Sequence, residues 1–158
     1  MIAVGEQIPD VGLWTMTADG PKAITSSEAL GTGKVVLFGV PGAFTPTCSD
    51  HHLPGFVARA EDIRAKGVDR IACIAVNDAF VMGAWAADRG ADDIVMLADG
   101  NGAFAAATGL ELDGSGFGLG KRNQRFAAVL QDGVVQHLAV ESGPGLDVSS
   151  AESILKVL

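Results

Sequence analysis

Three continuous apolar runs stand out along the chain, spanning residues 34–40, 70–76 and 94–98, and each stops at a polar or glycine-containing turn. A short apolar run that does not alternate with polar residues is typical of a strand buried on both faces of a sheet. The stretches of about 46–66 and 79–89 lie between these strands and favour helices. Strands that alternate with helices predict βαβ crossovers in a sheet covered by helices on both faces.

The last third of the chain has a different pattern. Two β-prone runs, 125–130 and 134–140, flank an Asp-Gly pair, which is a strong signal for a hairpin. The three-residue spacing of Ser149 and Glu152 predicts a capping box that opens a helix running to the end of the chain. Glycines gather within residues 109–120, where we expect a long, mobile loop.

Together these elements predict an α/β protein with a thioredoxin-like fold, in which a βαβ half and a ββα half share a central mixed sheet flanked by helices. The residues before position 34 would add an N-terminal hairpin and a short helix. No repeat, low-complexity tract or linker interrupts the chain, so we expect one domain over residues 1–158.

Composition narrows the range of partners. Nineteen acidic against eleven basic side chains give a net charge of −8, and such a surface repels a phosphate backbone, so we expect no nucleic-acid partner. All apolar runs are far shorter than the roughly 20 residues that cross a bilayer, so no membrane is expected. The first residues do not resemble a signal peptide, and two cysteines make no disulfide scaffold, which favours a cytoplasmic protein.

Cys48 follows a predicted buried strand directly and lies at the start of a predicted helix. Pro46 suits the first helical position and Thr45 the N-cap, which places Cys48 in the first turn. There, unpaired backbone N–H groups and the helix dipole favour the thiolate over the thiol. The position suits a nucleophile; a small buried apolar residue is the alternative. Pro54, inside the same helix, predicts a kink.

The side chains near Cys48 give no sign of a metal or another cofactor. On a helix, His51 and His52 point about 100° apart, and no second cluster offers ligands at zinc-like spacing. We interpret His52 as a wall of the cysteine pocket and His51 as a surface residue. Cys73 lies in the middle of an apolar run and is interpreted as buried. No cysteine lies three residues from Cys48, which excludes a Cys-x-x-Cys redox centre.

Pro41, Thr45 and Cys48 match the pattern Pro-x-x-x-Thr/Ser-x-x-Cys, the active-site motif of peroxiredoxins, and the surrounding segment resembles the type II (peroxiredoxin-5) subfamily. Residues 76–85 resemble the second signature of this family. Residues 120–126 resemble its Gly-x-Arg-Ser-x-Arg-Tyr/Phe stretch. The resemblance covers nearly the whole chain.

This resemblance implies a thiol-dependent peroxidase that reduces hydrogen peroxide and alkyl hydroperoxides. Cys48 would be the nucleophile and pass through a sulfenic acid; Thr45 would offer its hydroxyl to the peroxide, and Arg125 would hold the thiolate. Pro41 would shield the pocket from water, and Arg122 is the competing guanidinium. The further residues of the implied pocket are Gly42, Phe44, Thr47, His52, Phe80 and Trp85.

Recycling of the sulfenic acid depends on a second thiol. Some relatives carry a resolving cysteine at the position of Val148, which closes that route here. A Cys48–Cys73 disulfide would need Cα atoms within about 7 Å. We do not expect a cysteine in the middle of a strand and one at a helix entrance to come this close without local unfolding. We therefore expect an external thiol, glutathione or glutaredoxin, to reduce the sulfenic acid. The alternatives are a Cys48–Cys73 disulfide reduced by thioredoxin, or a non-catalytic redox-sensing module. The resemblance also implies a homodimer.

Overall fold

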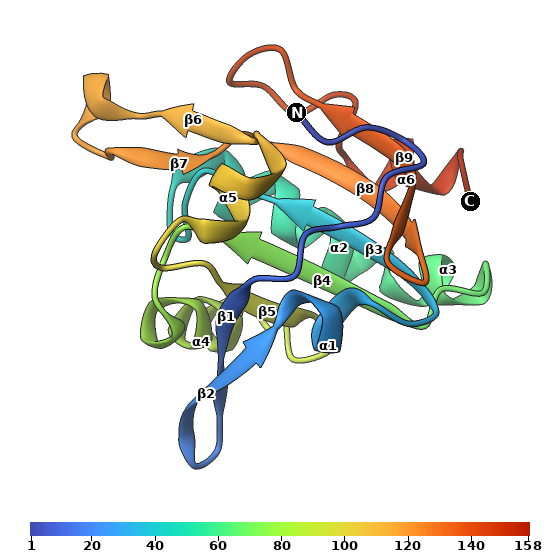
Figure 1. Cartoon of the computed structure of the whole chain (residues 1–158), viewed down its shortest axis with the longest axis horizontal. Helices are drawn as coiled ribbons and strands as arrows, with labels where there is room; N and C mark the ends of the chain where they lie inside the picture. The colour runs from blue at the N-terminus through green and yellow to red at the C-terminus, as the bar shows by residue number, and fades with distance from the viewer.

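The computed structural model describes residues 1–158, which are built around a seven-stranded mixed sheet (Figure 1). The strand order is β2-β1-β5-β4-β3-β8-β9. At its centre, β3 (Lys34–Gly39), β4 (Arg70–Ala75) and β5 (Val95–Ala98) run parallel to one another. These strands are the three apolar runs of the sequence, and their burial confirms the prediction.

One edge of the sheet is the hairpin of β8 (Phe126–Gln131) and β9 (Val134–Val140), with β8 antiparallel to β3. Asp132 and Gly133 connect the two strands with φ angles of 50° and 79°. Two consecutive residues with positive φ match the right-handed twist of a two-residue hairpin turn, which is why Asp-Gly is favoured there. The predicted hairpin is confirmed.

At the opposite edge, β1 (Gly12–Thr17) and β2 (Gly20–Thr25) form the N-terminal hairpin, and the short helix α1 (Ser26–Leu30) follows. Thr25 and Glu28 make a reciprocal capping box that starts α1. The arrangement confirms the thioredoxin-like α/β fold with an added N-terminal hairpin.

Helices cover both faces of the sheet. One face packs against α2 (Leu53–Ala58), α3 (Ala60–Ala65), α4 (Ala79–Asp88) and α6 (Ala151–Leu155). The other packs against α1 and α5 (Ala103–Thr108). The first face has the larger buried cluster, which contains both cysteines.

The predicted helix over 46–66 is interrupted. It begins as expected, but Cys48–His52 form a π-helical turn, η1, in which the N–H of Leu53 binds the carbonyl of Cys48. Pro54 has no N–H, and its ring would clash with the carbonyl four residues earlier in a regular α-helix. The wider π turn accommodates this proline, so the expected kink takes the form of a π turn followed by α2.

The predicted glycine-rich loop is wrong, because β6 (Glu111–Asp113) and β7 (Lys121–Asn123) pair there as a separate antiparallel ribbon. A short 3₁₀ helix, η2 (Ser115–Phe117), lies between them. The N–H of Gly114 donates to the carbonyl of Gly120 at 2.7 Å and closes the ribbon. The strands are too short to show an apolar alternation, which is why the sequence pattern favoured a loop.

The start and end of the last helix also differ from the prediction. Ser150, not Ser149, is the N-cap of α6 and accepts from the N–H of Ser153 at 3.1 Å. The hydroxyl of Ser149 instead donates to the carboxylate of Glu141 at 2.6 Å. The helix ends at Leu155, three residues before the end of the chain.

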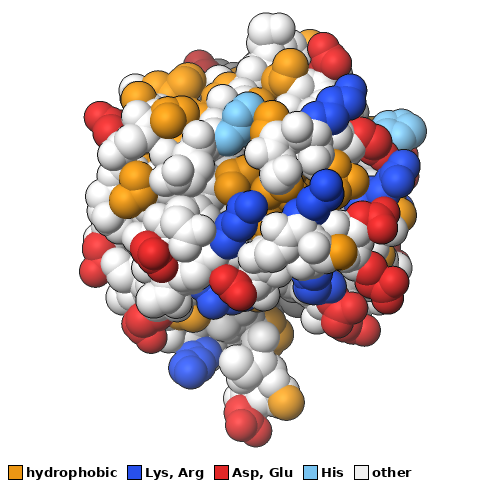
Figure 2. Space-filling view, turned by 90° about the vertical axis from the view of Figure 1, so that its right-hand side faces the viewer, with side chains coloured by type: hydrophobic (Ala, Val, Ile, Leu, Met, Phe, Trp, Pro, Cys, Tyr) orange, Lys and Arg blue, Asp and Glu red, His pale blue; other side chains and the backbone are white.

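None of the helices combines the length and the apolar character needed to cross a bilayer. Figure 2 shows the end of the molecule that carries α3, where Lys and Arg side chains lie among Asp and Glu. For example, Nη1 of Arg59 lies 3.7 Å from Oδ2 of Asp62, and its Nε lies 3.6 Å from Oε1 of Glu152. Basic groups at this end are therefore dispersed among acidic ones.

Candidate active site

The sulfur of Cys48 lies in the first helical turn after β3 and has two polar neighbours. The helix begins at Pro46, as predicted. The hydroxyl of Thr45 lies 2.9 Å from Sγ, and Nη2 of Arg125 donates to Sγ at 3.1 Å. Cys48 itself is fully buried. A guanidinium aimed at a sulfur in a site closed to water can make a charge-assisted hydrogen bond to the thiolate, the form of cysteine that acts as a nucleophile.

The Thr45 hydroxyl also lies 2.7 Å from the carbonyl oxygen of Gly42. A hydroxyl carries one proton, so it can donate to the carbonyl or to the sulfur but not to both at once. When it donates to the carbonyl, its lone pairs face the side of the sulfur and can accept from another group. Thr45 can therefore change its donor direction without moving the side chain.

The loop that carries Thr45 is held from two sides. The N–H of Ala43 donates to Oδ1 of Asn77 at 3.0 Å, just after β4. Nη1 of Arg122, on β7, lies 3.5 Å from the carbonyl of Pro41 and 3.4 Å from that of Val76. Arg122 thus links the loop, through the Pro41 carbonyl, to the end of β4, while the other candidate guanidinium, that of Arg125, contacts the sulfur.

Behind Arg125 lies His52. Nη1 of Arg125 is 2.9 Å from Nδ1 of His52, and Nε2 of His52 is 2.9 Å from the carbonyl oxygen of Ser149. Burial in the first place, and next the Arg125 cation, lower the pKa of His52 from 6.5 to about 3. His52 is therefore neutral near pH 7 and contacts the active-site arginine directly, a role beyond that of a pocket wall.

Sequence reasoning missed Glu141, which follows β9. Its carboxylate accepts from the hydroxyl and the N–H of Ser149 and from the N–H of Asp147, at 2.6, 2.8 and 2.9 Å. Burial alone would raise the pKa of Glu141, but these hydrogen bonds outweigh it and lower the pKa. A single Glu after a strand carries no signal of such a role, and Ser149 resembles an ordinary helix cap.

A cavity of about 490 Å³ opens beside Pro41 and Arg125. Leu112, Phe117 and Leu119 of the β6–β7 ribbon make its wall apolar, and Phe117 is 89% exposed. The cavity is wide enough for a small organic molecule, whereas the sulfur itself stays covered.

Comparison with known proteins agrees with this site. The family model described as Redoxin matches residues 3–155. Peroxiredoxin-2B of Arabidopsis thaliana is 48% identical over 159 residues, covering 99% of this chain and 98% of the relative. The chain is a type II peroxiredoxin. Among solved structures, a protein of Burkholderia cenocepacia is 47% identical with a TM-score of 0.97, covering 100% of this chain and 98% of the other.

Reduced Prx3 of Vibrio vulnificus, solved in complex with hydrogen peroxide, is 49% identical to this peroxiredoxin, with a TM-score of 0.95 and coverage of 99% of each chain. The peroxiredoxin is accordingly a thiol-dependent peroxidase, and Cys48 is its peroxidatic cysteine.

Three predicted pocket residues of the peroxiredoxin belong to the active-site loop or the first helical turn. A Cβ atom at Gly42 would lie 3.0 Å from Nη1 of Arg122 and 3.2 Å from Cγ2 of Thr45, so a larger residue there would have to displace these side chains. Phe44 has a φ of 65° and its side chain is 49% exposed. Thr47, in the first helical turn, is half-buried.

None of the six predicted pocket residues lines the cavity beside Arg125, and the last two, Phe80 and Trp85, belong to α4. Phe80, in the first turn of α4, is 66% exposed and lines a different cavity together with Trp14. Trp85 is buried beneath the π turn, where its Nε1–H donates to the hydroxyl of Ser49 at 3.0 Å. Trp85 therefore supports the turn that carries Cys48 from behind.

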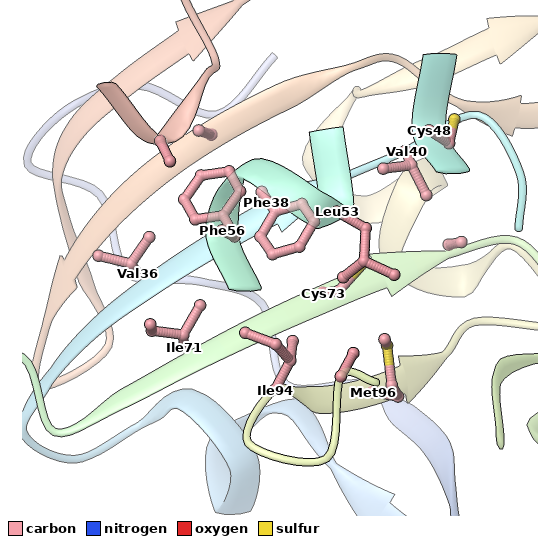
Figure 3. Packing of buried hydrophobic residues seen from close by; sticks show 14 of the residues in the cluster. Val36, Phe38, Val40, Cys48, Leu53, Phe56, Ile71, Cys73, Ile94 and Met96 are labelled. Carbon is pink, nitrogen blue, oxygen red and sulfur yellow. The ribbon is translucent and has the colours of Figure 1, made fainter. Parts of the chain in front are cut away.

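Cys73 of the peroxiredoxin lies within β4, where Phe38 of β3 and Met96 of β5 are its neighbours in the sheet. Figure 3 shows it inside the packed layer, with Leu53 beside it, whereas Cys48 lies at the entrance of the helix. Burial, and next the sulfur of Cys48, raise the pKa of the Cys73 thiol well above its ordinary value. Both cysteines are free thiols.

Proposed function

We propose that this peroxiredoxin reduces hydrogen peroxide and small organic hydroperoxides and is reduced in turn by glutathione or glutaredoxin. The observation that carries the proposal is the sulfur of Cys48 with a hydroxyl at 2.9 Å and a guanidinium at 3.1 Å. The peroxide complex of the Vibrio vulnificus relative supports the choice of substrate.

In the first step, the Cys48 thiolate attacks one peroxide oxygen and the O–O bond breaks. A new S–O bond forms, and the bonding electron pair leaves with the second oxygen, which takes up a proton and departs as water or an alcohol. The sulfur is oxidised to a sulfenic acid and the peroxide is reduced. Negative charge thus moves from the sulfur to the leaving oxygen.

Arg125 suits this movement of charge, because a guanidinium has donors in a fixed fork and can contact both the sulfur and an oxygen bound beside it. In the proposed pathway the Thr45 hydroxyl accepts from the peroxide O–H while donating to the carbonyl of Gly42. Pro41, which lines the cavity mouth, limits the access of water. These contacts orient the peroxide for attack.

In the second step, an external thiol attacks the sulfur of the sulfenic acid, releasing water and forming a mixed disulfide. A second external thiol then frees Cys48 and leaves the two reductant sulfurs joined. Cys73 is poorly suited to replace the external thiol, because it lies between two paired strands and burial keeps its thiol protonated.

The test is turnover of hydrogen peroxide with each reductant system. We expect the wild type and Cys73→Ser to turn over equally with glutathione and glutaredoxin, and mass spectrometry to find a glutathione adduct on Cys48. A Cys48–Cys73 disulfide, with turnover by thioredoxin that Cys73→Ser abolishes, would replace external-thiol recycling. No turnover with any thiol would support the redox-sensing alternative.

A homodimer is part of the same proposal. Trp14 and Phe80 are exposed by 46% and 66% and line one cavity of about 390 Å³. Phe44 belongs to the loop that Asn77 holds, just before α4. Exposed aromatic side chains of this kind are enriched at protein–protein interfaces. Sedimentation should give twice the chain mass, and Phe80→Asp should give the monomer.

A further inference from the structure

A continuous polar chain runs from the reactive sulfur to the loop between β9 and α6. Arg125 contacts Cys48 with one terminal nitrogen and His52 with the other, at 3.1 and 2.9 Å. The far nitrogen of His52 lies 2.9 Å from the carbonyl oxygen of Ser149. A carbonyl only accepts, so Nε2 bears the ring proton, and the lone pair on Nδ1 accepts from Arg125.

Glu141 closes this chain into a ring. Its backbone N–H donates to the carbonyl of Arg125 at 2.9 Å. Its carboxylate accepts three hydrogen bonds, two of them from Ser149, the residue whose carbonyl binds His52. Glu141 thus fixes the backbone of Arg125 directly, and it fixes the side chain of Arg125 through Ser149 and His52.

That the residue in contact with Arg125 is a neutral histidine, His52, and not a carboxylate matters for the charge beside the sulfur. Arg125 is 7% exposed and makes no ion pair with a carboxylate. A carboxylate at position 52 would pair with the guanidinium and weaken its attraction for the Cys48 sulfur. A neutral imidazole fixes the direction of the guanidinium without neutralising its charge. The carboxylate is kept at a distance, behind Ser149.

We propose that Glu141, acting through Ser149 and His52, is a positioning residue that holds the Arg125 guanidinium on the peroxidatic sulfur. The β9–α6 loop, whose residues 141–144 line the cavity beside Arg125, is therefore part of the active-site machinery, although the hydrogen bonds to the sulfur come from Thr45 and Arg125. This inference rests on the proposed role of Arg125 in the peroxide step.

A double-mutant cycle tests it, with the second-order rate constant of the reduced enzyme with hydrogen peroxide as the readout. Removing a hydrogen bond to a charged group slows a step by about ten- to a hundredfold, and we expect Glu141→Ala to fall in this range. Glu141→Gln keeps an oxygen acceptor for Ser149 and should recover most of the rate. Glu152→Ala removes an exposed carboxylate on α6 and should change nothing.

The decisive comparison is made in the Arg125→Ala background, where Glu141→Ala should cause no further loss, because it acts through the missing guanidinium. Equal losses in both backgrounds would show a merely structural role and overturn the proposal. A rate for Glu141→Ala equal to wild type would also overturn it while leaving the role of Arg125 intact. An unchanged rate in Arg125→Ala would instead remove the proposed function of Arg125 and this inference together.

If Glu141→Ala does not fold, a pair of substitutions at His52 decides the matter. The amide of Asn lies about where Nδ1 does and can still accept from Arg125, whereas that of Gln lies about where Nε2 does and can bind only Ser149. Each substitution breaks the path from Glu141 to Arg125 at a different contact, so we expect both variants to lose about ten- to a hundredfold of the peroxide rate and neither to cause a further loss in the Arg125→Ala background. A wild-type rate in His52→Asn would show that the contact with Ser149 is not needed and would overturn the proposal.

Discussion

The buried neutral imidazole of His52 should make the folded protein sensitive to mild acid. Its pKa is lowered from 6.5 to about 3, so between these values the unfolded chain binds a proton that the folded chain does not. Folding stability then rises with pH in this window and is lost as the pH falls. At about pH 5 the pH lies about 1.5 units below the ordinary pKa of histidine, and each unit corresponds to about 1.4 kcal/mol. Between about pH 7 and about pH 5 the free energy of unfolding therefore falls by roughly 2 kcal/mol.

Urea unfolding of the reduced protein at the two pH values measures this loss, and a matched pair of variants isolates it. His52→Gln removes the titrating group. Between about pH 7 and about pH 5, the free energy of unfolding of this variant should therefore decrease by about 2 kcal/mol less than that of the wild type. His51→Gln makes the same change at the exposed neighbour and should behave as the wild type. The lowered pKa of Glu141 adds a loss only at more acidic pH. Equal acid sensitivity of His52→Gln and the wild type would refute the reasoning.

Three further predictions concern the site and its support. Arg125→Ala removes the donor 3.1 Å from Sγ and should slow the peroxide step, measured by rapid mixing, by about a hundredfold or more; a change below about threefold would remove Arg125 from the mechanism. Trp85→Phe leaves the buried Ser49 hydroxyl without its donor and should lower the free energy of unfolding by about 1–3 kcal/mol, as measured in urea. Gly39→Ala would bring a Cβ to 2.1 Å from the buried ring of Phe126, so we expect a loss of roughly 1–3 kcal/mol. Gly12→Ala, which meets no atom within 4 Å, is its strand control.

The central sheet could be predicted because its strands carry their own signal. The apolar runs of β3, β4 and β5 are buried on both faces, and such strands need no alternation to be recognised. Asp132-Gly133 marks the C-terminal hairpin because few other residues adopt two successive positive φ angles.

Other elements depend on contacts between distant residues and left little local signal. The β6–β7 ribbon has strands of three residues and exists through its own pairing. Ser149 and Ser150 are chemically equal candidates for the N-cap of α6, and only the carboxylate of Glu141 decides between them. The π turn at Cys48 follows from Pro54, but a kink is all that the proline alone predicts.

The active site divides in the same way. Thr45 and Cys48 share one helical turn, so local helix geometry predicts their contact. Arg125 is 77 residues away from Cys48 in sequence and was identified through the family resemblance. His52 is four residues after Cys48, about one helical turn, so the sequence predicts its place near the cysteine. Its contact with Arg125, and the part of Glu141 behind it, appear only in the folded chain.

The central claim is that the Cys48 sulfur, held beside a guanidinium, is the atom that reduces peroxide. Its most direct test treats the fully reduced protein with one equivalent of hydrogen peroxide, traps sulfenic acid at once and maps it by mass spectrometry. We expect one added oxygen, on Cys48, in nearly every molecule, with Cys73 unmodified and no peroxide consumed by Cys48→Ser. Oxidation that appears on Cys73 instead, or peroxide consumption by Cys48→Ser at the wild-type rate, would contradict the claim.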